Sequence, residues 1–96
     1  MSNKSASRVV TVGNPQGLHA RPADLFVKIA NQFSASVEVV KGNDRVDGKS
    51  ILGILTLGAQ HGTQLEINAV GPDSDEALSA LAELVEQGFD ERVEHN

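Results

Sequence analysis

The sequence predicts a two-layer α+β domain, in which an antiparallel sheet is covered on one face by helices. The chain of 96 residues is long enough for one domain with a modest core. The predicted elements follow the order β-α-β-β-α-β-α, with no repeat or linker among them. Apolar and polar residues alternate in the last predicted strand, which indicates a sheet with one face in solvent.

The first half of the chain predicts a strand, a helix and a hairpin. Residues 8–13, RVVTVG, are rich in β-branched side chains, which favour a strand. A helix is predicted to begin near Ala20, because Pro22 suits a first helical turn. Apolar residues then recur at helical spacing, at Leu25, Phe26, Ile29, Ala30 and Phe33. The stretch SVEVVKG predicts a second strand, and a tight turn at residues 42–43 leads into a brief strand at residues 44–47.

The second half of the chain contains one ambiguous stretch. Residues 50–58, SILGILTLG, fit either a buried strand or a short helix. We favour the helix, because the stretch begins with a serine, a good helix cap, and ends with a glycine, a common helix stop. Residues 63–71 alternate between apolar and polar side chains and predict a strand. The stretch DSDEALSALAELVEQGF predicts the last helix, capped by Asp73 or Ser74.

Composition restricts the setting of the domain. The chain contains no cysteine, which excludes disulfides and thiolate metal sites. No apolar run approaches the roughly 20 residues that span a bilayer, and the polar first residues lack the core of a signal peptide. We therefore expect a soluble, cytoplasmic domain at residues 8–88, a flexible segment at residues 1–7 and an acidic tail at residues 89–96.

The net charge of -5 is unevenly distributed along the chain. Residues 71–96 carry eight acidic residues against one arginine, whereas residues 1–70 carry seven basic residues against five acidic ones. This distribution argues against a pervasively basic nucleic-acid-binding surface. It leaves room for a local basic site that holds an anion.

One histidine, His19, stands at the start of the predicted helix, with Arg21 beside it. Neutral imidazole is a nitrogen nucleophile near neutral pH, so His19 can accept a phosphoryl group and release it again. The first amides of the helix and the guanidinium of Arg21 are suitable partners for the added negative charge. Gly17 permits close approach of the main chain just before the histidine. The alternative is a histidine in a surface loop that has no chemical role.

Other chemistries find less support in the sequence. The remaining histidines, His61 and His95, lie in a predicted loop and in the tail, and nothing supplies three metal ligands at a familiar spacing. The serines lie in no recognisable turn motif of a hydrolytic triad. We therefore expect neither a metal nor a cofactor.

Two stretches, GLHARPADLFVKIA and GKSILGILTLGAQHGTQLEI, follow one another along the chain. In their order and separation they resemble the HPr family, the histidine phosphocarrier proteins of the phosphoenolpyruvate-dependent sugar phosphotransferase system. The resemblance covers roughly residues 8–87. It implies an open-faced sandwich, with a four-stranded antiparallel sheet in the order 1-4-2-3 and three helices on one face. It also implies a phosphoryl carrier and not an enzyme that turns over a small molecule.

The resemblance assigns roles to residues of the first stretch. It implies that His19 accepts a phosphoryl group from phosphorylated enzyme I and passes it to an enzyme IIA-type sugar-transport component. Arg21 is implied to steady that group. Three neighbours are expected to support the phosphate: Gln16, Gly17 and Ala20.

The resemblance also assigns roles to the second stretch. It implies that Ser50 is a regulatory site, phosphorylated by an HPr kinase/phosphorylase. The structural alternative, a helix cap, is compatible with this role. A set of basic and apolar residues is expected to contact the partner proteins: Lys28, Lys49, Ile51, Leu52 and Leu55. The alternative for the two lysines is that they are ordinary solvated charges on helix surfaces.

Two other functions stay open on the sequence. The first is a regulatory HPr paralogue, which signals through its phosphorylation without sugar uptake. The second is a small α+β module that binds a ligand without covalent chemistry. For the leading hypothesis, the phosphoryl carrier, we expect a monomer that binds neither nucleic acid nor a membrane.

Overall fold

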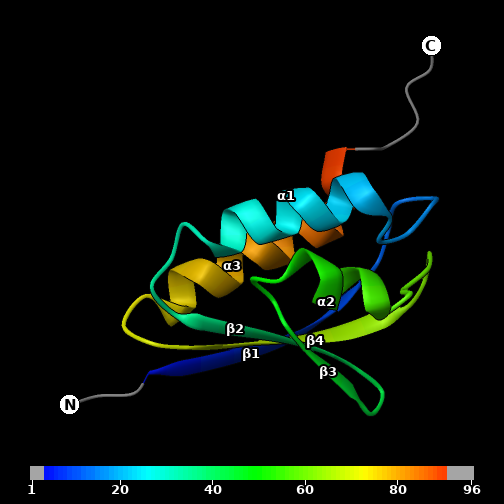
Figure 1. Ribbon diagram of the computed structural model, residues 1–96. Helices are drawn as coiled ribbons and strands as arrows, with labels where there is room; N and C mark the ends of the chain where they lie inside the picture. Colours follow the sequence, from blue (N-terminus) through cyan, green and yellow to red (C-terminus); the bar gives the residue numbers. More distant parts are fainter. Residues whose placement is uncertain (1–3, 91–96) are drawn as a thin grey trace.

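The computed structural model describes residues 4–90 of the 96-residue chain. Its elements follow the order predicted from the sequence, and a short 3-10 helix ends the described part (Figure 1). The elements are β1 (Ser5–Thr11), α1 (Ala20–Ala30), β2 (Ser36–Lys41), β3 (Asp44–Asp47), α2 (Ile51–Thr56), β4 (Gln64–Val70), α3 (Ser74–Glu86) and η1 (Gly88–Asp90).

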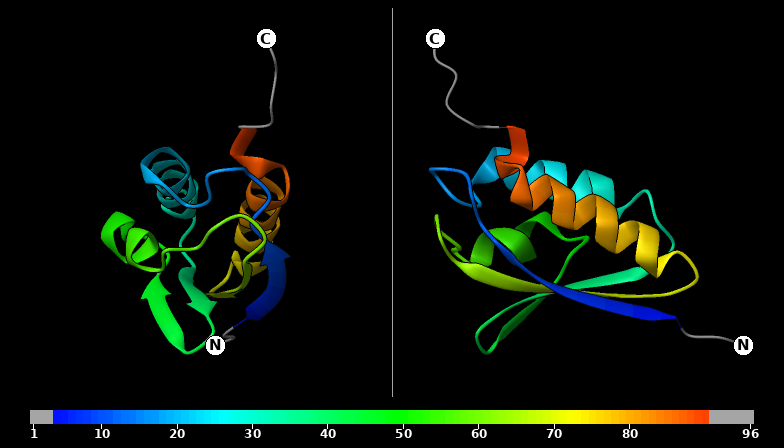
Figure 2. Two further views of the ribbon diagram at one scale, coloured as in Figure 1. Left: turned by 90° about the vertical axis from the view of Figure 1, so that its right-hand side faces the viewer. Right: turned by 180° about the vertical axis from the view of Figure 1, so that it is seen from behind.

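The four strands form one antiparallel sheet in the order β1-β4-β2-β3. This is the order that the resemblance implied. The three α-helices lie together over one face of the sheet, and the opposite face is open (Figures 1 and 2). The predicted two-layer α+β fold is therefore confirmed.

The apolar core lies between the sheet and the helices. Inward-facing strand residues, each at most 2% exposed, form one side of it: Val10, Val39, Leu65 and Ile67. Each helix contributes a side chain that is at most 1% exposed: Phe26, Ile54 and Leu81. Full burial of one such side chain stabilises a fold by about 1.5–3 kcal/mol. These contacts therefore hold the two layers together.

The ambiguous stretch at residues 50–58 contains the short helix α2. The amide of Gly53 donates a 3.0 Å hydrogen bond to Oγ of Ser50, so the predicted serine cap is confirmed. A Cβ atom added to Gly53 would lie 3.2 Å from Cβ of Val46 in β3. The glycine therefore allows α2 to pack closely against β3.

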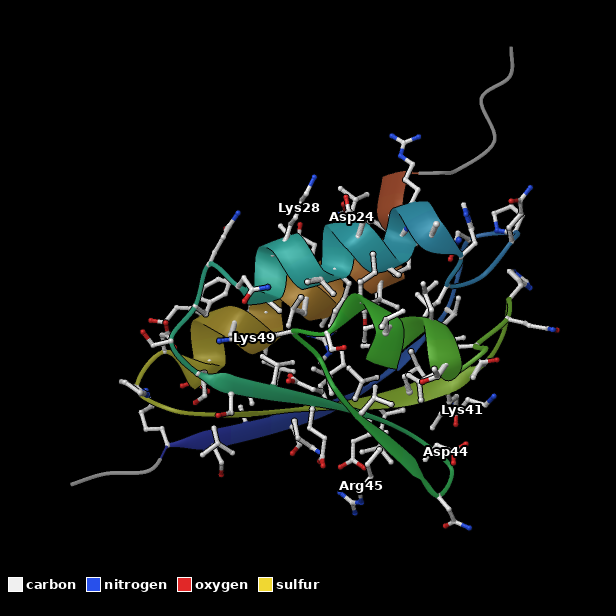
Figure 3. The ribbon with its side chains drawn as sticks, viewed as in Figure 1. Asp24, Lys28, Lys41, Asp44, Arg45 and Lys49 are labelled. Carbon is white, nitrogen blue, oxygen red and sulfur yellow. The ribbon has the colours of Figure 1, made fainter. Side chains whose placement is uncertain are left out.

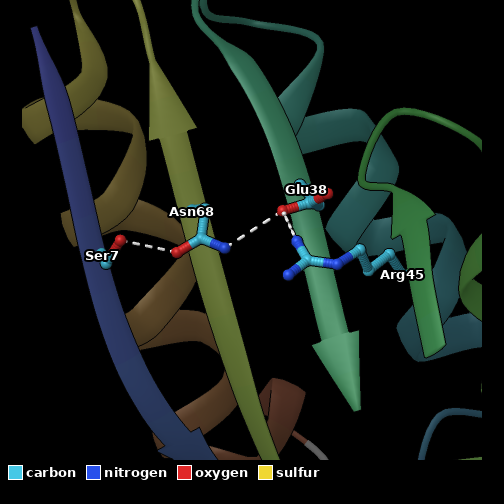
Figure 4. Close-up of polar contacts among 4 residues, drawn as sticks. All are labelled: Ser7, Glu38, Arg45 and Asn68. Atoms are coloured by element: carbon cyan, nitrogen blue, oxygen red, sulfur yellow. Dashed lines mark hydrogen bonds and ion pairs between the residues drawn. The ribbon is translucent and has the colours of Figure 1, made fainter. Parts of the chain in front are cut away.

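The open face of the sheet carries a chain of polar contacts that crosses all four strands (Figure 4). Oγ of Ser7 donates to Oδ1 of Asn68 at 2.6 Å. Nδ2 of Asn68 and the guanidinium of Arg45 both donate to Oε1 of Glu38, at 3.1 and 3.0 Å. The bond from Asn68 is the main reason why the pKa of Glu38 lies below its usual value. Because Asn68 is paired directly with both Ser7 and Glu38, these contacts favour the observed strand register.

Two boundaries expected from the sequence differ in the structure. β1 begins at Ser5, so residues 5–7 pair with β4 instead of forming a flexible segment. Phe89, expected in the acidic tail, is 0% exposed and belongs to the core. Its backbone is left-handed (φ 57°, ψ 28°), which costs roughly 1–2 kcal/mol, whereas burial of the ring stabilises by about 1.5–3 kcal/mol. The expectations for residues 1–3 and 91–96 lie outside the described residues.

The last helix begins as expected, with Asp73 at the N-cap position. Its carboxylate, however, accepts hydrogen bonds from the amides of Ser34 and Ala35, both at 2.8 Å, and not from its own helix. The bond from Ser34 is the main cause of the lowered pKa of Asp73. Asp73 thus connects the turn after α1 to the start of α3.

Candidate functional site

His19 is the N-cap residue of α1 and has the extended backbone of that position (φ -82°, ψ -170°). Its carbonyl accepts a hydrogen bond from the amide of Ala23 at 3.0 Å. The amides of Ala20 and Arg21 precede this bond and have no acceptor within the helix, and Pro22 has no amide hydrogen. Two main-chain donors therefore follow His19 directly, at the positive end of the helix dipole.

The surroundings of His19 suit an anion that arrives from solvent. His19 is partly buried, whereas Ala20 and Arg21 are exposed. Arg21 offers a guanidinium group, whose planar set of N–H donors matches phosphate oxygens. His19 and the residues that carry the guanidinium and the two helix amides thus follow one another in sequence at the start of α1. This arrangement can stabilise a doubly charged group attached to the imidazole.

The loop before His19 is held tightly by the protein itself. Gly17 has a left-handed backbone (φ +72°), and a Cβ atom there would lie 2.4 Å from the carbonyl oxygen of Ala59. The amide of Leu18 donates to that same oxygen at 2.9 Å. Close approach of the main chain was expected at Gly17, and the segment that approaches it is the one containing Ala59, which leads into β4. Gln16 is exposed in the preceding turn.

The amides of residues 17–19 all have acceptors within the protein. The amide of Gly17 donates to the carbonyl of Asn14 at 3.2 Å, that of Leu18 donates to Ala59, and that of His19 donates to the carbonyl of Gly17 at 2.9 Å. Of the expected supporting residues, Ala20 therefore offers a main-chain donor, whereas Gly17 contributes its backbone conformation.

Ser50 and His19 are associated with different ends of α2. Ser50 caps the start of α2, where the neighbouring Lys49 contacts the carbonyl of Phe33 beyond the end of α1. The segment after α2 contains Ala59, which contacts the loop before His19. The two sequence stretches therefore meet at the end of α2 that lies opposite Ser50. Ser50 itself is partly buried.

The three apolar residues expected to contact partners differ in exposure. Leu52 is 72% exposed and Ile51 is 37% exposed. Leu55 is partly buried and packs against the core. Leu52 and Ile51 thus form the exposed apolar part of α2, which we call the α2 apolar surface.

The two lysines expected to contact partners both bind within the protein (Figure 3). Nζ of Lys28 lies 3.0 Å from the carboxylate of Asp24, one helical turn earlier on α1. Nζ of Lys49 donates to the carbonyl of Phe33 at 2.8 Å. Lys28 is a surface charge in an exposed ion pair, whereas Lys49 connects α2 to the end of α1.

Sequence reasoning missed Asn14 in the loop before His19. Its side chain is 1% exposed, and Nδ2 donates to the carbonyl of Gly17 at 2.6 Å. The available signal was the stretch NPQG, because asparagine often begins a turn by bonding to nearby backbone. That pattern predicted a turn but did not show that the side chain would be buried.

Among residues 4–90, no group of three or more His, Cys, Asp or Glu side chains is placed to hold a metal ion. In the same part of the chain, no helix has the length and apolar character needed to cross a membrane.

Comparisons with known proteins agree on one family. Residues 6–87 match the family model described as "PTS HPr component phosphorylation site". Phosphocarrier protein HPr of Pseudomonas putida is 42% identical over 86 residues, covering 88% of this chain and 96% of that protein. The HPr-like protein Crh of Bacillus subtilis is 44% identical over 71 residues, covering 74% and 84% of the two chains. The crystal structure of an HPr from Thermoanaerobacter tengcongensis is 42% identical, with a TM-score of 0.88 over 92% of this chain and 99% of that one.

Proposed function

The chain belongs to the HPr family of the phosphotransferase system, and we propose that it carries a phosphoryl group on His19. The donor is phosphorylated enzyme I, which draws on phosphoenolpyruvate, and the acceptor is an enzyme IIA-type component of sugar transport. The observation that carries this proposal is the position of His19 at the N-cap of α1, directly before two helix amides and Arg21.

In this proposal each transfer exchanges one bond to phosphorus for another. A nitrogen lone pair of the His19 imidazole forms the new N–P bond while the bond between phosphorus and the donor group breaks. The second transfer reverses these roles, and the imidazole leaves as the acceptor binds phosphorus. The amides of Ala20 and Arg21, with the Arg21 guanidinium, stabilise the charge of the bound group between the two events. The protein is thus a carrier that is regenerated, in the cytoplasm where phosphoenolpyruvate is produced.

The same proposal makes the α2 apolar surface a contact for partner proteins. Leu52 and Ile51 are the exposed apolar residues of this helix, and large exposed apolar groups suit protein contacts. Arg21 is the exposed cation closest in sequence to His19 and can attract acidic partners. In this proposal the charge of Lys28 attracts partners less strongly, because Asp24 partly neutralises it. Lys49 acts indirectly, because its bond to Phe33 stabilises the fold around α2.

We further propose that an HPr kinase/phosphorylase phosphorylates Ser50. A phosphate there would add about two negative charges beside the α2 apolar surface. That charge would oppose the approach of acidic partners and so reduce transfer to and from His19. The cap observed at Ser50 is compatible with this role, because a negative group is favoured at the start of a helix.

A second candidate function is regulatory signalling without sugar uptake. The observation that favours it is the 44% identity to the HPr-like protein Crh of Bacillus subtilis over 71 residues. The two functions differ in what receives the signal. A transport carrier must pass its phosphoryl group from His19 to an enzyme IIA-type domain, whereas a regulator acts when its own modification changes.

Incubation with phosphoenolpyruvate, Mg²⁺ and the native enzyme I tests the carrier function. We expect wild-type protein to gain one phosphoryl group that is lost in acid, and His19→Ala to gain none. His61→Ala is the matched control, because His61 is an exposed histidine in the loop before β4 and should not be required. Absence of the gain in wild-type protein would contradict the proposal. Addition of an enzyme IIA-type domain then separates a transport carrier, which loses the group, from a regulator, which retains it.

Light scattering during size-exclusion chromatography tests the expected monomer. The expected result is the molar mass of one chain. A dimer mass at working concentration would contradict this part of the proposal.

A further inference from the structure

Asn14 is a buried polar residue in the loop that leads to His19. Its side chain is 1% exposed, and among residues 4–90 it shares full burial with only one other polar side chain, Ser74. Nδ2 of Asn14 donates a 2.6 Å hydrogen bond to the carbonyl of Gly17. Burial of an amide is costly unless it is hydrogen-bonded, so this contact requires a defined orientation of the side chain.

The carbonyl of Gly17 accepts two hydrogen bonds, one from Asn14 and one from the amide of His19 at 2.9 Å. The amide of Gly17 in turn donates to the carbonyl of Asn14 at 3.2 Å. Asn14 therefore binds both sides of Gly17, and Gly17 binds His19 directly. The side chain of Asn14 and the amide of His19 therefore share the Gly17 carbonyl as acceptor.

The Gly17 carbonyl sets the direction in which the main chain enters His19. Leu18 is 6% exposed, and its amide is bound to the carbonyl of Ala59 at 2.9 Å. The peptide group between Gly17 and Leu18 is planar and rigid, so the bond to Ala59 holds its amide side and the bond from Asn14 holds its carbonyl side. Rotation of this peptide group would remove the acceptor of the His19 amide and tilt the imidazole relative to the amides of Ala20 and Arg21. The bond from Asn14 opposes that rotation.

We propose that Asn14 is a positioning residue for phosphoryl transfer, which orients His19 at the start of α1 through the Gly17 carbonyl. This inference rests on the proposed function of His19. Asn14 makes no contact with the phosphoryl group in this proposal. Its effect is on the rate of transfer and not on the binding of enzyme I, because Asn14 is 1% exposed and offers no surface to a partner. A displacement of reacting groups by about 1 Å can slow a reaction by up to about a hundredfold.

The test compares Asn14→Ala with wild type in phosphoryl transfer from enzyme I, under conditions that separate kcat from KM. Asn31→Ala is the matched control, because Nδ2 of Asn31 also donates to a main-chain carbonyl, that of Val27 at 3.0 Å, near the opposite end of α1. We expect Asn14→Ala to lower kcat about tenfold with KM within about twofold of wild type. We expect Asn31→Ala to change neither. A wild-type kcat for Asn14→Ala would overturn the proposal.

A spectroscopic measurement on the unphosphorylated protein tests the positioning separately. We expect the ring resonances of His19 to shift in Asn14→Ala and to stay in place in Asn31→Ala. Loss of thermal stability in Asn14→Ala with unchanged His19 resonances and unchanged kcat would show a structural role only, against the proposal. This readout needs no enzyme I, so it decides on Asn14 even if wild-type protein accepts no phosphoryl group and the proposed function fails.

If Asn14→Ala does not fold, Asn14→Ser provides a second test of the proposal. The serine hydroxyl retains a donor but reaches less far than the amide. We expect Asn14→Ser to have a kcat between those of Asn14→Ala and wild type, with wild-type KM. A kcat equal to that of wild type, together with unshifted His19 resonances, would overturn the proposal in this variant too.

Discussion

The ammonium group of Lys49 donates a 2.8 Å hydrogen bond to the carbonyl of Phe33. This bond joins the residue before the Ser50 cap to the turn that follows α1. The sequence placed Lys49 among the charges that attract partner proteins. Its charge is instead engaged within the fold, so its removal should affect stability before it affects binding.

Lys49→Met tests this assignment, because methionine keeps a long apolar stem but has no donor. We expect the free energy of unfolding to fall by about 1 kcal/mol, since the Phe33 carbonyl loses its partner. Urea denaturation measures the change. Lys28→Met is the control, because the exposed Lys28–Asp24 pair should contribute no more than about 0.5 kcal/mol. Equal losses in the two variants would contradict the role of Lys49.

Ser50→Ala removes the side-chain acceptor for the amide of Gly53. We expect a loss of about 1 kcal/mol in the free energy of unfolding, which is typical of a deleted N-cap. Ser50→Asp should stay close to wild type in stability, because aspartate caps a helix equally well. Ser79→Ala, at an exposed position inside α3, is the matched control and should not destabilise the protein. A wild-type stability for Ser50→Ala would show that the observed bond does not stabilise α2.

Leu52 and Ile54 form a matched pair on the short helix α2. Leu52 is 72% exposed, whereas Ile54 is 0% exposed. We expect Ile54→Ala to lower the free energy of unfolding by about 2–5 kcal/mol, and Leu52→Ala to change it by less than about 0.5 kcal/mol. In transfer assays Leu52→Ala should raise KM for enzyme I, because the α2 apolar surface contacts partners in the proposed function. An unchanged KM for Leu52→Ala would contradict the proposed contact between Leu52 and enzyme I.

The lowered pKa of Asp73 predicts a pH dependence of stability. The Asp73 carboxylate accepts hydrogen bonds from the amides of Ser34 and Ala35, and these bonds are stronger when the group is ionised, so folding favours the charged form. Its contribution is fully present above the unfolded pKa, about 3.9, and is lost as the pH falls through the lower folded pKa. The stability difference between wild type and Asp73→Asn should therefore be constant near neutral pH and shrink below about pH 4.

Denaturation of both proteins at a series of pH values measures this difference. Asp75→Asn is the control, because Asp75 is an exposed acid in the same helical turn and pairs with Lys4 at 3.3 Å. We expect this substitution to have a smaller effect at neutral pH than Asp73→Asn. A difference for Asp73→Asn that grows as the pH falls would reverse the predicted sign.

Local patterns were sufficient for the order of elements and for the position of His19. A strand alternates every two residues and a helix repeats every 3.6, so a short window of sequence carries the type of element. Pro22 indicates the first helical turn for the same reason, which puts His19 at the N-cap. The Ser50 cap is also local, because its acceptor and donor are three residues apart. The strand order came from a resemblance, since no single segment contains it.

The roles of Lys49, Asp73 and Phe89 depend on contacts between segments that are distant in the sequence. From the sequence, Lys49 fits a solvated charge and Asp73 fits a helix cap, and their bonds to residues 33–35 form only because the fold brings the end of α1 to them. From the sequence, Phe89 was assigned to the acidic tail, but in the structure its ring is buried in the core. Asn14 lies between these cases, because its bond to Gly17 is local but its burial needs the surrounding core. Local rules describe what a residue can do with its neighbours in the chain, and packing selects which of those possibilities is used.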